Sequence, residues 1–396
     1  MSAHPAQLLA LYLLGLAASA VGLVALYLLW RLSKPRRMKL HEDDRPAVVQ
    51  ASPAPPEVPV RRKRHALALL VPLLMLLWVF LGKFLLMPFY PGATAPRAEL
   101  PAGRSATVQG TSGAQLAVTN YGPAEGPTLL LTHGWGADQH EWTWLMRALP
   151  QSTRVVTWDL PGLGRSSRPR GEYTMAAMAS DLDSVVSSVK GGPVILVGHS
   201  VGGMLNLEYA RLHPEKLGRQ VSGVVQANTT YTNPIETKKN ADRSRKLQDP
   251  VFKPLLHVVA SASPVFRAMG WLAYQSGLAH LQLARQSFAG GQTWDQLDEM
   301  ARYAYRSSPR VLAEGVLAMM KWDGTDVLRQ IKVPTLIISG EQDVTTLPAA
   351  SDRMEKDIPS AQRVRVDPAA HMGPVEQDRR YAEAVVAFAG SVGIAK

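Results

Sequence analysis

The chain has 396 residues, of which 43 are Lys or Arg, 32 are Asp or Glu and none is Cys. A hydrophobic fraction of 46% with 19% charged residues is enough to build a sizeable core, which excludes a globally disordered protein. The absence of cysteine excludes disulfides, thiolate nucleophiles and cysteine-ligated zinc or iron–sulfur sites, although it is compatible with any redox compartment.

The excess of positive charge is concentrated near the N-terminus. Ten Lys or Arg residues stand against four Asp or Glu residues between Arg31 and His65. This basic segment lies between two apolar runs: Leu8–Trp30, which has no charge, and Ala66–Tyr90, in which Lys83 is charged. A basic stretch between two such runs is typical of a membrane protein, so we expect membrane lipids, and no nucleic acid, as partners.

Each apolar run is long enough to cross a membrane as a helix, since about 20 residues span a hydrocarbon core of ~30 Å. A cleaved signal peptide is the alternative for the first run, but Met1–Gln7 contain no Lys or Arg and the run continues well past the small residues Ala18–Ala20. A buried or interfacial helix is the alternative for the second run, which two prolines interrupt. We predict transmembrane helices in residues 1–30 and 66–90.

The basic segment sets the expected orientation. Residues 31–65 contain six prolines, which favour an extended loop. Because basic residues flank both apolar runs on this loop, the positive-inside rule predicts that the loop is cytoplasmic and that both termini lie on the periplasmic or extracellular side. The cluster Arg61–Arg64 is also suited to lipid headgroups.

After a linker rich in Pro, Gly and Ala at residues 91–104, residues 105–396 have the pattern of one globular domain. Helix-like stretches, for example Met175–Val189, Gly202–Leu212 and Arg380–Ser391, alternate with short apolar runs. This alternation predicts an α/β fold with a mostly parallel sheet, which opens with an antiparallel hairpin. The predicted strands are 115–121, 128–132, 154–158, 194–198, 223–227, 335–339 and 363–366.

The strongest chemical signal is Gly198-His199-Ser200-Val201-Gly202. The apolar strand that starts at Val194 runs directly into this Gly-x-Ser-x-Gly sequence, and an amphipathic helix follows at once. In that context the pattern indicates a nucleophile elbow, in which a strained turn exposes the serine hydroxyl and glycines leave room for the backbone. The helix N-terminus behind Ser200 offers unpaired N–H groups to a developing negative charge.

Together with three further motifs, this sequence resembles the serine branch of the α/β-hydrolase superfamily. The segment that contains His133-Gly134-Trp135-Gly136 resembles the family's oxyanion loop, and Asp159-Leu-Pro-Gly-Leu-Gly resembles its turn after the fourth strand. Asp343 and His371 follow the penultimate and last predicted strands, where the family keeps its acid and its base. The resemblance implies an eight-stranded sheet with a helical cap, formed here by about residues 229–330.

The resemblance also implies the roles of individual residues. Ser200 is the expected nucleophile, His371 its base and Asp343 the orienting acid, while the backbone N–H groups of Trp135 and Val201 form the oxyanion hole. No cofactor or metal is expected. Four acids in this region compete for the acid's role, and Asp343 is favoured by its offset from the strand over Glu341, Asp352 and Asp367.

Several residues near these motifs have a structural alternative. We expect His133 to support the oxyanion loop, His199 to pack beside the nucleophile and Asp159 to cap its turn. The tryptophans 135, 142 and 144 either line an acyl pocket or pack in the core. The cap holds the apolar clusters 255–265 and 269–284, which either contribute the substrate pocket or form a lid without selectivity.

The sequence therefore predicts a membrane-anchored serine hydrolase, an esterase or lipase-like enzyme that acts on small-molecule or lipid esters without an obligate protein partner. Haloperoxidase-like, C–C bond hydrolase and acyltransferase activities on the same fold remain alternatives. A non-catalytic binding module is a further alternative, which the complete set of site residues disfavours.

Overall fold

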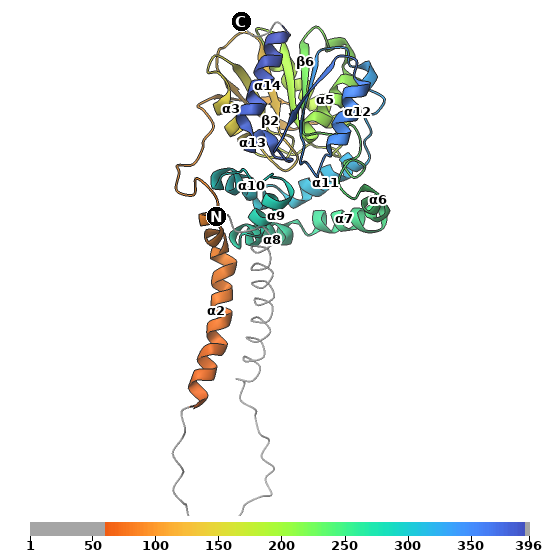
Figure 1. The fold of residues 1–396 in the computed structure, drawn as a ribbon. Helices are drawn as coiled ribbons and strands as arrows, with labels where there is room; N and C mark the ends of the chain where they lie inside the picture. The colour runs from red at the N-terminus through yellow and green to blue at the C-terminus, as the bar shows by residue number, and fades with distance from the viewer. Residues whose placement is uncertain (1–59, 393–396) are drawn as a thin grey trace, which may run out of the picture.

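In the computed structural model, which describes residues 60–392 and their side chains from residue 73 onward, the C-terminal part of the chain is built on one eight-stranded sheet (Figure 1). The order across the sheet is β1-β2-β4-β3-β5-β6-β7-β8. β2 runs antiparallel to β1 and β4, and all other neighbours are parallel. The predicted mostly parallel sheet with an opening hairpin is confirmed. The strands are β1 Arg104–Gln109, β2 Gln115–Tyr121, β3 Thr128–Thr132, β4 Arg154–Trp158, β5 Val194–His199, β6 Val221–Ala227, β7 Thr335–Gly340 and β8 Ala361–Val366.

The observed strands coincide with the predicted apolar runs or extend them by one or two residues. The largest differences are at β6 and β8, which begin before their apolar runs because backbone pairing continues beyond them. Val194 pairs with Val221 and Ile195 with Gly223, so an irregularity in β6 accommodates the extra residue.

Helices cover both faces of the sheet, as the alternation of strand side chains requires. On β3, Leu130 packs in a core cluster with side chains of α4, α5 and α12, whereas Leu129 and Leu131 pack with α3 and α14 on the other face. Each fully buried leucine contributes about 1.5–3 kcal/mol. The helices are α2 Val60–Leu86, α3 Thr143–Ala148, α4 Met175–Ser188, α5 Val201–Leu212, α6 Ala241–Leu247, α7 Lys253–Ser261, α8 Ser263–Gln275, α9 Leu278–Gln286, α10 Trp294–Arg306, α11 Pro309–Met320, α12 Pro348–Asp357, α13 Gly373–Glu376 and α14 Asp378–Ser391, with short turns η1 Met87–Phe89, η2 Gln139–Trp142, η3 Pro214–Lys216, η4 Gln248–Phe252 and η5 Leu328–Gln330.

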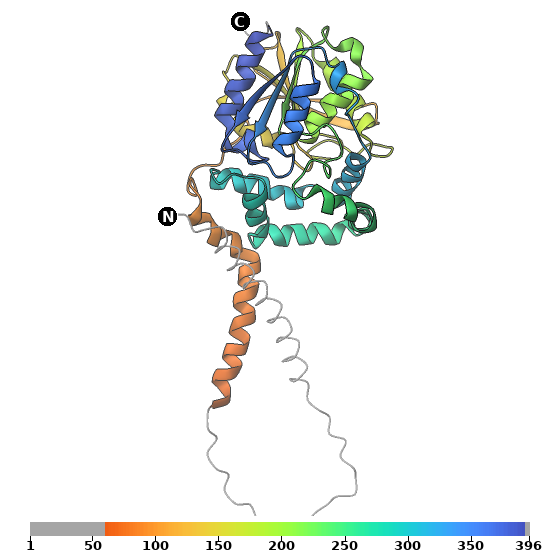
Figure 2. The same ribbon diagram turned by 45° about the vertical axis from the view of Figure 1, so that its right-hand side comes forward.

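The helices α6 to α11 lie between β6 and β7 in the chain, and we call them the cap. Figures 1 and 2 show the cap across one end of the sheet, with α2 on the side of the cap that faces away from the sheet. α10 begins with a capping box, in which Thr293 Oγ1 accepts from Gln296 N at 3.3 Å and Gln296 Oε1 accepts from Thr293 N at 2.8 Å.

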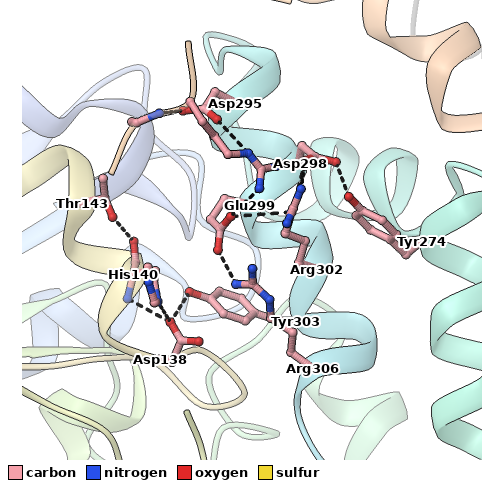
Figure 3. Close-up of polar contacts among 12 residues, drawn as sticks. Asp138, His140, Thr143, Tyr274, Asp295, Asp298, Glu299, Arg302, Tyr303 and Arg306 are labelled. Carbon is pink, nitrogen blue, oxygen red and sulfur yellow. Dashed lines mark hydrogen bonds and ion pairs between the residues drawn. The ribbon is translucent and has the colours of Figure 1, made fainter. Parts of the chain in front are cut away.

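A polar network on α10 joins the cap to its surroundings (Figure 3). Asp298 accepts hydrogen bonds from Tyr274 Oη at 2.8 Å and Arg302 Nη2 at 3.1 Å, and it pairs with Arg97 of the segment after α2. At the other end of the helix, Tyr303 donates to Asp138, 3.1 Å away, in the loop after β3. Because this network contacts both the segment after α2 and the loop after β3, it fixes the cap relative to the sheet.

α2 packs its C-terminal part against α8 of the cap. The rings of Phe80 and Trp271 are 5.8 Å apart, and Lys83 Nζ lies 4.0 Å from the ring centre of Tyr274. α2 begins at Val60, so Arg61–Arg64 belong to the helix and not to the predicted loop 31–65. The six prolines all precede residue 60, whereas arginine and lysine are good helix formers.

The predicted membrane spans meet the structure only in part. The run Leu8–Trp30 and residues 31–59 lie outside the described residues. Among residues 73–392, whose side chains the structure describes, no single helix has both the length and the apolar composition that crossing a membrane requires. The apolar stretch Leu73–Phe89 is shorter than that, and membrane anchoring therefore stays a prediction.

Candidate active site

Ser200 occupies the sharp turn between β5 and α5. Its backbone has φ 54° and ψ −118°, a conformation that costs free energy in a residue with a side chain. The turn needs glycine on both sides. A Cβ on Gly198 would lie 2.3 Å from the carbonyl carbon of Gly202, and a Cβ on Gly202 would lie 2.2 Å from Thr132 O. The turn therefore presents the Ser200 hydroxyl at the carboxyl end of β5, a central strand of the sheet.

His371 links Ser200 to Asp343. Its Nε2 lies 3.1 Å from Ser200 Oγ, and its Nδ1 lies 2.8 Å from Asp343 Oδ2. Because a carboxylate only accepts, the proton of the neutral imidazole belongs on Nδ1, which leaves Nε2 free to accept from the serine hydroxyl. Three residues that are far apart in the sequence thus form one hydrogen-bonded chain.

The carboxylate of Asp343 is buried and heavily hydrogen-bonded. It accepts from Thr345 N at 2.7 Å, from Thr346 N at 2.9 Å and from Thr346 Oγ1 at 2.7 Å, in addition to His371. Burial alone would raise the pKa of Asp343, but the charge of protonated His371 and these hydrogen bonds hold it below its ordinary value. The acid therefore stays ionised at neutral pH.

The three competing acids pair elsewhere. Glu341 accepts from Ser339 Oγ at 3.0 Å, Asp352 from Arg365 Nη2 at 2.9 Å and Asp367 from Gln342 Nε2 at 3.2 Å. Their positions are consistent with the sequence-based preference for Asp343.

The two predicted oxyanion donors come from the start of α5 and from the turn after β3. Val201 is the first residue of α5, where a backbone N–H has no partner within the helix. This N–H group lies at the positive end of the helix dipole. Trp135 lies in the turn after β3, and its indole Nε1 donates to Leu312 O at 3.0 Å. The side chain of Trp135 is thereby anchored to the cap. Both donors remain predictions, since no bound oxyanion is present to contact them.

A cavity of about 470 Å³ opens above Ser200 and His371. Its wall is mostly apolar, and the cap supplies much of it, including Leu283, Met300 and Val316. Trp135 lines this cavity, whereas Trp142 and Trp144 are buried in core clusters and do not. A second cavity, of about 660 Å³, lies beside the loop after β3 and contains none of Ser200, His371 and Asp343.

A second imidazole–carboxylate pair lies directly behind these residues. His199 Nδ1 is 2.6 Å from Glu141 Oε1, and His199 Nε2 is 2.9 Å from the backbone oxygen of His371. Since both ring nitrogens face acceptors, His199 carries both protons and a positive charge. The expectation that His199 merely packs beside the nucleophile is incomplete.

The charges of His199 and Glu141 shift each other's pKa values. Burial opposes each charge, but the neighbouring Glu141 carboxylate raises the pKa of His199, and the neighbouring His199 lowers the pKa of Glu141. Glu141 also accepts from Gly134 N at 3.1 Å, so it holds the oxyanion loop. The sequence signal for Glu141 is weak: an acid beside two tryptophans, seven residues after Gly134.

The remaining polar residues of these motifs have structural roles, as expected. His133 Nδ1 donates to Gly134 O at 2.8 Å, and its Nε2 accepts from Leu160 N at 3.0 Å. Asp159 accepts from Arg165 N at 2.9 Å and so caps its turn. Among the residues with described side chains, no cluster of His, Asp or Glu is arranged to hold a metal ion.

Comparisons with known proteins relate this chain to alpha/beta hydrolases. A family profile described as "Alpha/beta hydrolase family" matches residues 129–384, well over half of the chain. A putative 2-succinyl-6-hydroxy-2,4-cyclohexadiene-1-carboxylate synthase of Bacillus subtilis (strain 168) is 28% identical over 71% of this chain and 97% of its own length. A pimeloyl-[acyl-carrier protein] methyl ester esterase of Nitrosospira multiformis is 27% identical over 67% of this chain and 95% of its own.

The fold is also similar to solved structures. A thermophilic esterase from Thermogutta terrifontis superposes with a TM-score of 0.59 at 23% identity, covering 74% of this chain and 99% of the esterase. At that identity, the likeness shows the shared fold.

Proposed function

Because the chain belongs to the alpha/beta hydrolase family, we propose that it is a serine hydrolase that cleaves carboxylic esters through Ser200, His371 and Asp343. The observation that carries the proposal is the continuous hydrogen-bonded chain from Asp343 through His371 to Ser200. The esterase among the relatives supports hydrolysis of esters at a general level.

The proposed reaction begins with proton transfer from Ser200 Oγ to His371 Nε2. The serine oxygen attacks the ester carbonyl carbon, and His371 then returns the proton to the leaving alcohol as the carbon–oxygen bond breaks. A water molecule then attacks the acyl-enzyme and gives a proton to His371, which returns it to Ser200 Oγ as the acyl carbon–oxygen bond breaks and the carboxylic acid is released. Asp343 stays ionised throughout and stabilises the imidazolium, which its lowered pKa favours.

The negative charge of the tetrahedral intermediates is assigned to the backbone N–H groups of Val201 and Trp135. One such donor contributes about 10²–10³ in rate. The position of Val201 at the start of α5 supports this assignment, because the helix dipole adds to the N–H group.

The wall of the cavity supports an ester with an apolar acyl or alcohol part. Apart from the polar groups around Ser200, the cap lines the site largely with aliphatic side chains such as Leu283, Leu312 and Val316. We further propose that the enzyme is anchored in a membrane through residues 1–30 and 66–90, with the basic segment 31–65, which includes the first turns of α2, cytoplasmic and the hydrolase domain on the other side. The charge distribution of the sequence supports that proposal.

The test is covalent labelling with a fluorophosphonate probe, followed by hydrolysis of p-nitrophenyl esters of increasing chain length. Ser200→Ala should abolish labelling and lower hydrolysis by about 10³ or more. Ser287→Ala is the matched control, because Ser287 lines the same cavity and should keep both activities. Labelling of a folded Ser200→Ala protein would contradict the assignment of the nucleophile.

A further inference from the structure

The outer face of the cap exposes an unusual amount of apolar surface. Seven large apolar residues there are between 38% and 59% exposed: Val251, Leu255, Val258, Val265, Met269, Trp271 and Leu272. Single exposed apolar residues are ordinary, but a contiguous set marks an interaction site.

Six of these residues follow the helical period, and the seventh, Trp271, is next to Leu272 on α8. Val251, Leu255 and Val258 are spaced by four and three residues along η4 and α7, and Val265, Met269 and Leu272 repeat that spacing on α8. Each set therefore lies on one face of its helix. Since these faces point to solvent and not to the core, we call the seven residues the apolar stripe.

The stripe is continuous with α2. Trp271 of the stripe contacts Phe80, and α2 and α8 approach so closely at Gly82 that an added Cβ would lie 2.4 Å from Ser276 O. Apolar side chains of α2 are exposed as well, for example Leu73 at 60% and Leu77 at 52%. In Figures 1 and 2, α2 leaves the cap on the side away from the sheet, where α7 and α8 also lie.

Basic residues accompany the stripe. The helices α6 to α8, including η4, span residues 241–275 and hold five Lys or Arg residues but only two acids. An apolar helix face with basic neighbours is typical of helices that lie in the interface of an anionic membrane.

We propose that the apolar stripe lies in the headgroup–acyl boundary of an anionic lipid bilayer, which α2 enters beside it, so that the cap draws ester substrates from the membrane. The inference deepens the proposed function and rests on its membrane anchoring. A bilayer is the occupant that the continuity with α2 favours, because one membrane covers both apolar surfaces.

A third cavity lies between the stripe and the site. This cavity, of about 350 Å³, lies between α7 and α11 and is lined mainly by apolar side chains, among them Leu255, Phe252 and Val316. Leu255 belongs to the stripe, and Val316 also lines the cavity above Ser200. In this proposal, an apolar chain enters at Leu255 and passes Val316 toward the nucleophile. The substrate class that fits this path is a lipid ester.

The first test places an environment-sensitive fluorophore on the stripe of the full-length chain. Because the chain has no cysteine, Val258→Cys and Met269→Cys each provide a single thiol for nitrobenzoxadiazole. In vesicles of phosphatidylcholine and phosphatidylglycerol, both labels should shift to shorter wavelength and lose intensity when the lipid acyl chains are brominated. Lys332→Cys, just before β7 at the opposite end of the sheet from Ser200, is the control and should do neither.

Each other outcome overturns the proposal. A water-like spectrum at both stripe positions means that the face stays in solvent. A shifted spectrum that brominated lipids do not quench means that protein covers it, either residues 1–59 or a second copy of the chain. Vesicle flotation is measured in parallel, since a protein that does not float lacks the anchoring on which the docking rests, and that outcome overturns both. Ser200→Ala should keep the quenching, which separates docking from hydrolysis.

The second test is functional. Val258→Ser combined with Met269→Ser should lower hydrolysis of vesicle-embedded esters by about tenfold or more, because about 1.4 kcal/mol of lost apolar burial corresponds to one decade. Hydrolysis of a short water-soluble ester should not change, since neither residue lines the cavity above Ser200. The proposal would be overturned if the double variant hydrolysed the vesicle-embedded ester as fast as the wild type does, with the rate on the soluble ester also unchanged.

Discussion

Glu141 and His199 form a buried ion pair behind the candidate triad, with Glu141 Oε1 2.6 Å from His199 Nδ1. Glu141 holds the backbone N–H of Gly134, and the other ring nitrogen of His199 donates to the backbone oxygen of His371. One pair therefore positions both the oxyanion loop and the loop that carries the base. Neither residue touches Ser200 Oγ, so we regard them as positioning residues.

The first prediction concerns the stability that this pair provides. Glu141→Gln leaves a buried imidazole without its counter-charge, and we expect the free energy of unfolding to fall by roughly 3–5 kcal/mol. The raised pKa of His199 contributes stability that is present below about pH 6.5 and is lost as the pH rises through the folded pKa. The lowered pKa of Glu141 contributes stability above about pH 4.3 that is lost as the pH falls through its folded pKa.

The difference between wild type and Glu141→Gln should therefore be largest between about pH 4.3 and 6.5 and shrink at higher pH. Denaturant unfolding across this range measures it. The exposed Glu172 provides the control, and Glu172→Gln should stay within about 0.5 kcal/mol of wild type at every pH. A Glu141→Gln protein as stable as wild type would show that the pair carries no net charge interaction.

The second prediction separates Asp343 from its neighbours. Asp343→Asn removes the charge that orients and stabilises protonated His371, and kcat on a soluble ester should fall by about 10⁴. Glu341→Gln and Asp367→Asn should change kcat far less, because both acids pair with other residues. Steady-state kinetics on the folded variants measure these effects. A loss of about 10⁴ in kcat for Asp367→Asn would assign the role of the acid to Asp367, which follows the last strand.

The third prediction concerns the support of Trp135. Gly315 on α11 faces the indole ring so closely that an added Cβ would lie 1.8 Å from Trp135 Cζ2. Gly315→Ala should displace Trp135, together with its proposed oxyanion N–H, and lower kcat by up to about 10². Gly171→Ala is the control, because nothing lies within 4 Å of the added Cβ. Wild-type kcat and tryptophan fluorescence in Gly315→Ala would refute this role.

The fourth prediction concerns topology. If the basic segment 31–65 is cytoplasmic, a membrane-impermeant maleimide added to intact cells or spheroplasts should label Ser105→Cys and spare Ser52→Cys. Ser105 is exposed on β1, so the reagent can reach it. Both thiols should react after the membrane is permeabilised, which controls for access. Labelling of Ser52→Cys alone in intact cells would place the hydrolase domain in the cytoplasm.

The sequence by itself determines most of the sheet, because each strand has a local signal. A run of aliphatic residues such as Leu129–Leu131 is apolar on both faces, which is what a central parallel strand requires. The turn at Ser200 also has a local cause, since Gly198 and Gly202 permit a backbone that other residues would block. These signals depend only on neighbours in the chain, so they can be recognised without the fold.

Other properties depend on residues that are distant in the sequence, and the tertiary structure decided them. Nothing near His199 in the sequence indicates that Glu141, 58 residues earlier, meets its ring. Trp135 and Trp142 are both tryptophans in the segment after β3, and the sequence does not distinguish them. In the structure, the first lines the cavity and the second is buried in the core.

The stripe on α7 and α8 gives the physical reason for this limit. Its period predicts that Leu255 and Val258 share a helix face, but an apolar face that meets a core and one that meets solvent have the same spacing. Only the packing of the cap shows that this face is left open, 52% exposed at Leu255 and 54% at Val258. Periodicity determines which side chains lie together, and the long-range contacts of the folded chain determine what they contact.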